Sequence, residues 1–290
     1  MIDSFQSYKS RIESVLDTQL GSVKAPKKLK DAMKYGVFNG GKRIRPLLCY
    51  LTTEALGKTL DQADGIASAI ELNHCYSLIH DDLPAMDDDE LRRGLPTLHI
   101  QYDEATAILT GDALQALAFE SLAFDQHLDS KVKVELIQVL SRASGASGMV
   151  SGQMMDMAAV HHKISKSELT EMHNRKTGDL ISCSVRAGAI LGRGSPEEEE
   201  GLQAFGYALG LAFQVRDDIL DEIGNACVMG KLQGSDVAKE KNTFVSAYGL
   251  NGAEAYLIQL QQQAQEALLP LGDRAQALSD LSTFIIQRNY

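Results

Sequence analysis

Several kinds of residue are scarce or missing in this chain of 290 residues. It contains no tryptophan, only 6% aromatic residues and six prolines. No apolar run reaches the roughly 18 residues that a transmembrane helix needs. The core must therefore consist mainly of aliphatic side chains, and the few prolines permit long uninterrupted helices. The first residues lack the basic and apolar regions of a signal peptide, so we expect a cytoplasmic protein without a membrane span.

Cysteine and positive charge are also limited. The four cysteines include no CxxC pair, so we expect them to be reduced and structural in a chain of this length. Lys and Arg number 28 against 39 Asp and Glu, which gives a net charge of −11. This balance argues against a general polyanion binder and predicts no nucleic-acid partner. The chain has no obvious internal break, so we expect a single domain over residues 1–290.

Apolar residues recur at helical spacing through most of the chain, as in the run Leu109, Ala113, Ala116 and Leu117. Alternation of polar and apolar residues over the length of a strand is almost absent, and the breaks carry Gly or Pro. One helix start is explicit at 195–198, where Ser, Pro and two Glu follow one another. The sequence therefore predicts an all-α fold.

A dense acidic cluster follows an apolar helical stretch at 77–99, SLIHDDLPAMDDDELRRGLPTLH. Crowded carboxylates repel one another unless they are neutralised, and magnesium is typically held by one or two carboxylates plus substrate phosphates. Pro84 interrupts the helix, so Asp87 can turn back toward Asp81. Arg92 and Arg93 follow directly, and acids, metal and paired arginines together suit a diphosphate. A solvated helix end is the plainer alternative.

A second acidic pair lies in FQVRDDILD at 213–221. Asp217 and Asp221 are four residues apart, so they share one face of a helix. Taken alone they are as well explained by exposure to solvent. Two such clusters facing each other across a helical bundle would form a multi-metal clamp for a polyphosphate.

The sequence also contains basic residues that match the two acidic clusters in number and kind. NGGKRIRP at 39–46 is not a Walker A loop, but it places Lys42, Arg43 and Arg45 at the expected start of a helix, where anions bind well. His74 lies two helical turns before Asp81. The alternatives are a solvated basic turn and a core histidine. Further single lysines that are weak signals by themselves occur at Lys176, Lys231 and Lys241.

Taken together, these residues resemble the trans-isoprenyl diphosphate synthase family, and in particular its bacterial farnesyl diphosphate synthase branch. The resemblance runs from GGKRIRP at 40–46 to the final QRNY, and its most specific feature is DDLPAMD…RRG followed by DDILD. It implies an all-α bundle of the isoprenoid synthase type with a central cavity. The activity it implies is magnesium-dependent condensation of isopentenyl diphosphate with dimethylallyl or geranyl diphosphate to farnesyl diphosphate.

The resemblance also implies roles for individual residues. Three magnesium ions, replaceable by manganese, are expected on Asp81, Asp82, Asp87, Asp217 and Asp221. Isopentenyl diphosphate is expected to contact Lys42, Arg45, His74 and Arg93. The allylic diphosphate is expected to contact Arg92, Lys176, Lys231 and Lys241, with its carbon chain near Thr177, Gln214 and the GQxxD segment that holds Gln153 and Asp156.

Product length and assembly complete these expectations. Tyr76 and Ser77 lie one turn before Asp81 and are expected to form the floor of the tunnel that takes the growing chain, and a bulky Tyr76 favours a C15 stop. The family implies a homodimer. Departures from the family pattern are Ser151 before Gln153 and the segment 242–245, which replaces the usual KxTYP ending.

Four alternatives stay open on the sequence. A geranylgeranyl or geranyl diphosphate synthase would share the fold, and a non-catalytic partner subunit would keep the bundle for assembly only. A terpene cyclase would also use acidic clusters and magnesium, but it has no need for the second diphosphate site at Lys42, Arg45 and His74. A plain acidic helical binding protein is the least specific reading.

Overall fold

The computed structural model describes residues 2–223 and 241–288. These residues are almost entirely helical, which confirms the all-α prediction. The first half of the chain forms α1 (Ile2–Ser22), α2 (Lys27–Phe38), α3 (Ile44–Ala55), η1 (Leu60–Gln62), α4 (Asp64–Asp81), β1 (Leu91–Arg92), β2 (Leu95–Pro96), α5 (Leu98–Gln101), α6 (Glu104–Ala123) and α7 (Ser130–Ser144). The second half forms α8 (Met149–Ala159), α9 (Lys166–His173), η2 (Asn174–Gly178), α10 (Asp179–Gly192), α11 (Pro196–Ile223), α14 (Phe244–Tyr248), α15 (Leu250–Ala267), η3 (Leu269–Ala275) and α16 (Gln276–Gln287).

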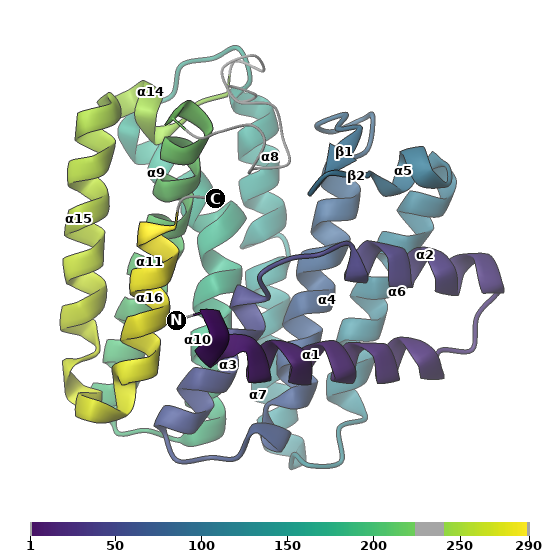
Figure 1. The fold of residues 1–290 in the computed structure, drawn as a ribbon, viewed down its shortest axis with the longest axis horizontal. Coiled ribbons are helices and arrows are strands. Elements are labelled where there is room, and N and C mark those ends of the chain that lie inside the picture. The colour runs from purple at the N-terminus through teal and green to yellow at the C-terminus, as the bar shows by residue number, and fades with distance from the viewer. Residues whose placement is uncertain (1, 224–240, 289–290) are drawn as a thin grey trace.

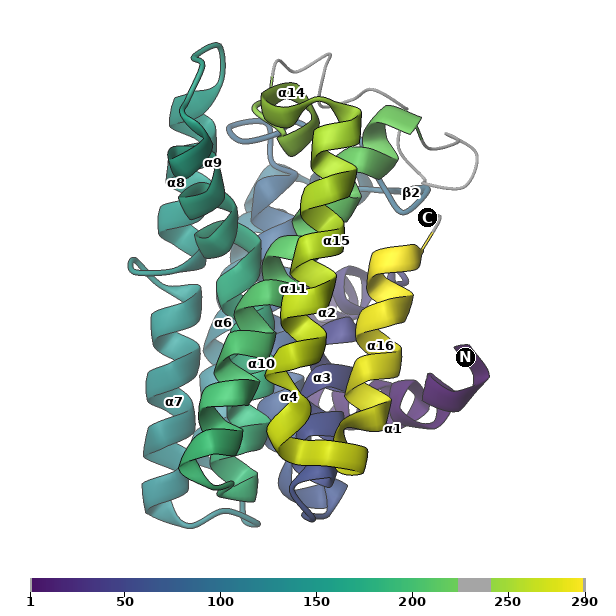
Figure 2. The same cartoon turned by 90° about the vertical axis from the view of Figure 1, so that its left-hand side faces the viewer.

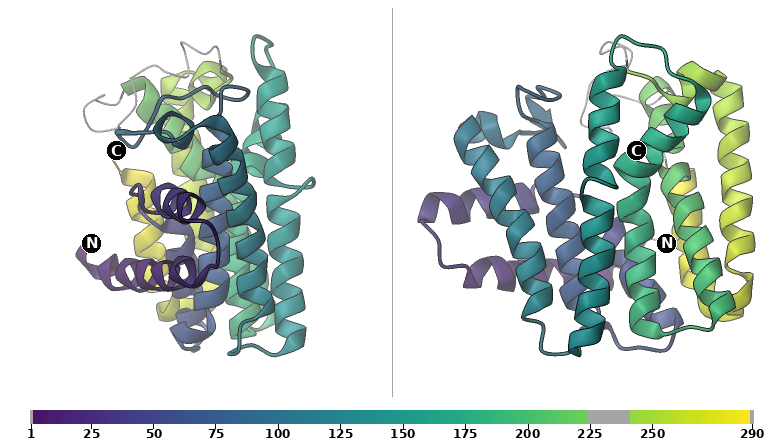
Figure 3. Two further views of the ribbon diagram at one scale, coloured as in Figure 1. Left: turned by 90° about the vertical axis from the view of Figure 1, so that its right-hand side faces the viewer. Right: turned by 180° about the vertical axis from the view of Figure 1, so that it is seen from behind.

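The long helices stand side by side, and α1 and α2 cross them (Figure 1). Helix α4 packs on α6, α10 packs on α3 and α11, and α11 packs on α15. Figure 2 shows α15 and α16 along one side of this bundle, and the view from behind in Figure 3 shows the long helices as one continuous wall. The C-terminal ends of α4 and α11 lie at the same end of the bundle, so the two acidic motifs reach one region (Figure 1).

The spacing of apolar residues explains which faces are buried. In α1, Ile12, Leu16 and Leu20 recur every four residues and form one buried stripe. Helix α4 is buried along most of its length, including polar Ser68, Glu71 and Asn73, as a central helix must be. The predicted start at Ser195 is also present: Glu198 N–H donates to Ser195 Oγ at 3.3 Å, and the Glu198 carboxylate accepts from Ser195 N–H at 2.7 Å.

One element was missed by the sequence analysis, a two-stranded antiparallel hairpin formed by β1 and β2. Its turn consists of Arg93 and Gly94, which both have positive φ angles of 56° and 79°. Two such residues in succession are typical of the type I′ turn that closes short hairpins. The strands are only two residues long, too short for any alternating pattern to be visible in the sequence.

Helices α3 and α10 approach each other closely at Gly188. A Cβ atom built on Gly188 would lie 2.6 Å from Thr52 Cβ and 2.8 Å from the Cys49 carbonyl oxygen. Because the latter is a backbone atom, it cannot move aside cheaply. The contact between these two central helices therefore requires a residue without a side chain.

We predict that Gly188→Ala lowers the free energy of unfolding by about 1–3 kcal/mol, because the added methyl group overpacks the α3–α10 contact. The matched control is Gly21→Ala in α1, where a Cβ atom meets nothing within 4 Å. There the better helix propensity of alanine should leave stability unchanged or slightly raised. Urea unfolding of both variants measures the difference, and equal midpoints would contradict a tight contact at Gly188.

Candidate active site

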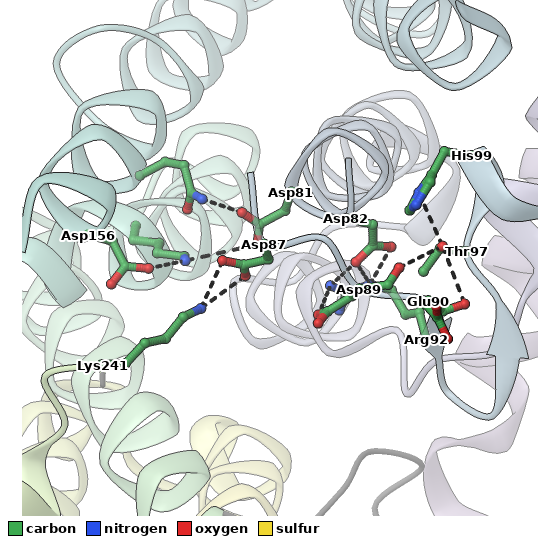
Figure 4. A network of polar contacts seen from close by, with 12 residues as sticks. Asp81, Asp82, Asp87, Asp89, Glu90, Arg92, Thr97, His99, Asp156 and Lys241 are labelled. Atoms are coloured by element: carbon green, nitrogen blue, oxygen red, sulfur yellow. Dashed lines mark hydrogen bonds and ion pairs between the residues drawn. The ribbon is translucent and has the colours of Figure 1, made fainter. Parts of the chain in front are cut away.

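The first acidic motif begins where α4 ends. Helix α4 stops at Asp81, and the chain then turns back so that Asp87 N–H donates to the Asp81 carbonyl oxygen at 2.9 Å. This is the return that the proline at 84 led us to expect. It places the carboxylates of Asp81 and Asp87 on the same side of the loop, toward the cluster of contacts shown on the left of Figure 4.

Three other segments supply the partners of these two carboxylates. Gln153 on α8 donates its amide to Asp81 Oδ1. Lys241 Nζ contacts the Asp87 carboxylate at 2.9 and 3.0 Å. Lys176 Nζ donates to Asp156 Oδ2 at 2.5 Å and lies 3.9 Å from Asp81 Oδ2. Residues from α4, α8, the η2 turn and the segment before α14 thus meet at one point (Figure 4).

Burial and charge oppose each other in this cluster. The pKa of Asp81 is raised, chiefly by burial and further by Asp87, although Lys176 works against the rise. For Asp156, burial would raise the pKa, but Lys176 and Lys241 outweigh it and the pKa is lowered. The lysines therefore offset part of the repulsion among these acids.

Lys176 and Thr177 lie in η2, a π-helical turn between α9 and α10. Such turns are rare and occur often at functional sites. Gly152 of α8 faces this turn so closely that a Cβ atom would lie 2.2 Å from the Lys176 backbone nitrogen. The turn is invisible in the sequence, where α9 and α10 look like one helix.

Asp82 takes a different direction from Asp81. It is buried, and it accepts hydrogen bonds from Arg92 Nε at 2.8 Å and from Arg92 Nη2 at 2.5 Å. Burial would lower the pKa of Arg92, but Asp82 outweighs it and the pKa is raised. Asp82 thus anchors the β1–β2 hairpin and lies apart from the Asp81–Asp87 pair (Figure 4).

A separate basic region forms around the loop before α3. Helix α3 starts at Ile44, so of the three basic residues expected in its first turn only Arg45 lies there, while Lys42 and Arg43 precede the helix. Arg43 is buried and pairs with Glu71 at 2.8 Å, which makes it a structural residue. Arg93 donates from Nη1 to the Gly40 carbonyl at 2.6 Å and to Asn39 Oδ1 at 3.0 Å.

Burial is the main electrostatic feature of this region. It lowers the pKa of Lys42 to about 8, with Arg288 and Arg93 adding to the shift. It also lowers the pKa of His74 well below its ordinary value, helped by Arg45 and Arg93. His74 is therefore neutral beside cationic neighbours, and the region is suited to an anion that would relieve their repulsion.

The second acidic motif is divided between two environments. The side chain of Asp217 is 45% exposed and pairs with Arg288 near the C-terminus at 2.5 Å. Asp221 is buried. Asp218, which the sequence analysis passed over, is also buried and accepts hydrogen bonds from Gln214 Nε2 at 2.8 Å and from Phe244 N–H at 2.7 Å.

Gln214 continues this chain of contacts, since its Oε1 accepts from Thr177 Oγ1 at 2.9 Å. Several of these residues line a small chamber of about 70 Å³, formed by Asp156, His173, Lys176, Gln214, Asp218, Lys241, Asn242 and Thr243. His173 packs against the Phe244 ring, and burial lowers its pKa to about 4, so it is neutral. The sequence held a signal for Asp218, its place beside Asp217, but none for His173 or Arg288.

The remaining candidates lie on the α4 side or cannot be placed. Tyr76 is buried on α4, with its ring edge against His80 at 5.8 Å between ring centroids. Ser77 donates its hydroxyl to the His74 carbonyl at 2.8 Å. Lys231 lies outside the described residues.

Comparison with known proteins places the chain among enzymes with this architecture. The sequence profile of the family described as polyprenyl synthetase matches residues 26–273. The chain belongs to this family. Farnesyl diphosphate synthase of Haemophilus influenzae is 44% identical over 99% of this chain and 98% of its own length, and the enzyme of Geobacillus stearothermophilus is 42% identical over 97% and 96%.

Solved structures agree with the sequence comparison. The geranyltransferase of Legionella pneumophila superposes with a TM-score of 0.88 at 38% identity and covers 99% of this chain and 96% of its own. The geranyltransferase of Helicobacter pylori, complexed with magnesium and isoprenyl diphosphate, superposes with a TM-score of 0.86 at 37% identity, with coverage of 98% and 96%. The predicted family and the isoprenoid synthase type of bundle are thereby confirmed for this polyprenyl synthetase.

The lowered pKa of Lys42 predicts how anion binding depends on pH. Lys42 carries a positive charge below about pH 8 and loses it above. Because the charged form attracts a diphosphate, we expect the affinity for inorganic diphosphate to fall about 10-fold between about pH 7 and about pH 9.5. Isothermal titration calorimetry without metal measures this affinity.

The control for this titration is Lys42→Arg, whose guanidinium keeps its charge over the whole range. Its affinity should change less with pH than that of the parent protein, which separates Lys42 from the titration of diphosphate itself. Equal pH profiles for the two proteins would exclude Lys42 as the titrating group.

Proposed function

We propose that this polyprenyl synthetase is a short-chain, magnesium-dependent prenyltransferase that joins isopentenyl diphosphate to dimethylallyl or geranyl diphosphate, with farnesyl diphosphate as product. The observation that carries the proposal is the presence of two separate charged regions at one end of the bundle, each suited to a diphosphate. One is the convergence of Asp81 and Asp87 with Lys176 and Lys241. The other is the basic region of Lys42, Arg45, His74 and Arg93. Two diphosphate substrates require two such places.

The donor set of the first place fits magnesium. Within residues 2–223 and 241–288, no three acidic, histidine or cysteine side chains already form a metal cage. Magnesium seldom needs one, because it is usually held by one or two carboxylates with substrate phosphates and waters. Asp81, Asp87 and Asp217 would hold it, with Asp82 and Asp221 in support. We expect three ions, replaceable by manganese. Bound magnesium would draw electron density from the allylic diphosphate as a Lewis acid.

The side chains around the first place favour departure of the allylic diphosphate. Lys176 and Lys241 extend into the cluster from two different segments, and they would exchange their contacts with Asp156 and Asp87 for contacts with the departing phosphate oxygens. Arg92 would add its charge from the hairpin. Lys231, in the segment outside the described residues, is assigned the same role from the sequence alone.

The positive charge left on carbon needs polar oxygen atoms without free water. Thr177 and Gln214 form a hydrogen-bonded pair beside the chamber, and Gln153 lies next to Asp81. Lys42, Arg45, His74 and Arg93 would hold isopentenyl diphosphate so that its double bond attacks the allylic carbon, which converts a bimolecular step into a local one. The released diphosphate would accept the proton that is then lost.

Product length would depend on the space below Asp81. Tyr76 is a bulky buried side chain about one turn before Asp81, and Ser77 lies beside it. We assign Tyr76 as the floor of the tunnel, which supports a C15 product over a C20 one. A geranylgeranyl or geranyl diphosphate synthase remains the alternative, and product analysis separates the three.

Assembly and location are part of the proposal. No helix in the described part of the chain is long and apolar enough to cross a membrane. Helix α6 exposes Ile108 and Leu109, and α8 exposes Val150 and Met154, so each offers apolar surface to a partner. We propose a homodimer in the cytoplasm.

The first test is the reaction itself. Purified protein, isopentenyl diphosphate, geranyl diphosphate and magnesium are expected to yield farnesyl diphosphate, and chelation of the metal is expected to abolish turnover. Product chain length is measured by chromatography after dephosphorylation. If the folded protein binds diphosphate but forms no product, the result would favour a non-catalytic subunit or a cyclase.

We also predict that Tyr76→Ala lengthens the main product from C15 to C20 or longer, because removal of the ring deepens the tunnel. Tyr207→Ala, on the exposed side of α11, is the matched control and should leave the product unchanged. An unchanged C15 product from Tyr76→Ala would show that another side chain forms the floor.

A further inference from the structure

Asp218 is the least explained acid of the site. The residue is only 3% exposed, and its side chain lies between α11 and α14. Oδ1 accepts a hydrogen bond from Gln214 Nε2 at 2.8 Å, and Oδ2 accepts one from the Phe244 backbone N–H at 2.7 Å. Gln214 and Asp218 both line the small chamber that also holds Lys176 and Lys241.

These contacts fix the direction of the Gln214 amide. A carboxylate can only accept hydrogen bonds, so the Gln214 group that faces Asp218 must be the NH₂ group. The carbonyl oxygen of Gln214 must then face the other way, where it accepts from Thr177 Oγ1 at 2.9 Å. The opposite orientation would set a carbonyl against a buried carboxylate and leave that carboxylate oxygen without its donor.

Phe244 requires a hydrogen-bond acceptor at the position of Asp218 Oδ2. Its backbone N–H can only donate, so Oδ2 of Asp218 must remain an acceptor. Phe244 is also three residues after Lys241, which contacts Asp87. Asp218 therefore links the side chains expected near the allylic carbon to the segment before α14, which carries Lys241.

We propose that Asp218 is a positioning residue that keeps the carbonyl oxygen of Gln214 directed toward Thr177 and the reacting carbon. The inference rests on the proposed function. It adds a reason why the negative end of the Gln214 amide dipole faces the allylic carbon, where positive charge develops. Asp218 acts through Gln214 and not as a metal ligand, although it is the immediate neighbour of Asp217.

Asp218→Asn tests this with almost no change in volume. An asparagine can keep its oxygen toward Phe244 N–H and offer its NH₂ group to a reversed Gln214, whose own NH₂ group then faces Thr177 Oγ1. The contacts with Phe244, Gln214 and Thr177 all stay satisfied, so the fold should be kept. The amide dipole at the reacting carbon is reversed, and we expect kcat to fall about 10- to 100-fold. KM for both diphosphates and the urea midpoint should change little.

Two comparisons test whether Asp218 acts through Gln214. In a Gln214→Met background there is no amide to orient, so adding Asp218→Asn should lower kcat no further. Asp217→Asn, in contrast, should raise the magnesium concentration needed for half-maximal rate, whereas Asp218→Asn should not. Full activity of Asp218→Asn, additive losses in the double variant, or rescue by excess magnesium would each overturn the proposal.

A direct measurement does not depend on turnover. The Gln214 side-chain amide signal, assigned in ¹⁵N-glutamine-labelled protein by its loss in Gln214→Met, should exchange slowly with water and shift markedly in Asp218→Asn. An unchanged signal would overturn the proposal even if kcat falls. If the parent protein forms no prenyl product, the proposed function fails, while this signal still decides whether Asp218 orients Gln214.

Discussion

The arrangement of this site depends on the neutralisation of acids at the end of α4 by lysines that are distant in sequence. Asp81 and Asp87 lie in a partly buried loop, where burial raises the pKa of Asp81. Lys176 comes from a π-helical turn and Lys241 from the segment before α14. Because the two lysines come from different segments, and Asp156 and Gln153 from α8, the contacts at this point join four parts of the chain.

A second consequence is the separation of tasks among neighbouring acids. Asp81 faces the lysines, while Asp82, the next residue, is buried against Arg92. On α11, Asp217 is partly exposed, while Asp218 is buried against Gln214 and Phe244 N–H. In each motif, one acid lies where it can contact a ligand, and the next acid forms hydrogen bonds that stabilise the surrounding structure. Adjacent acids in the sequence therefore do not share one role.

Much of this could be predicted from the sequence because the signals were local. Apolar spacing predicted the helices, and the proline at 84 predicted the return of Asp87 toward Asp81. The hairpin and the π-helical turn could not be predicted, since both are too short for a periodic pattern. Asp218 was passed over although it adjoins Asp217. His173 and Arg288 were missed because their importance lies in contacts with distant segments, His173 with Phe244 and Arg288 with Asp217, which no spacing rule reveals.

The β1–β2 hairpin directs the side chains of two adjacent arginines to different partners. Arg92 lies in β1 and binds Asp82, whereas Arg93 lies in the turn and reaches the Gly40 carbonyl. Gly41, beside this contact, has a φ of 118°, a backbone conformation that favours glycine. Exposed turns usually tolerate insertions. This one should not, because a single added residue would shift one arginine out of its place, so its length should vary less among related sequences than its exposure suggests.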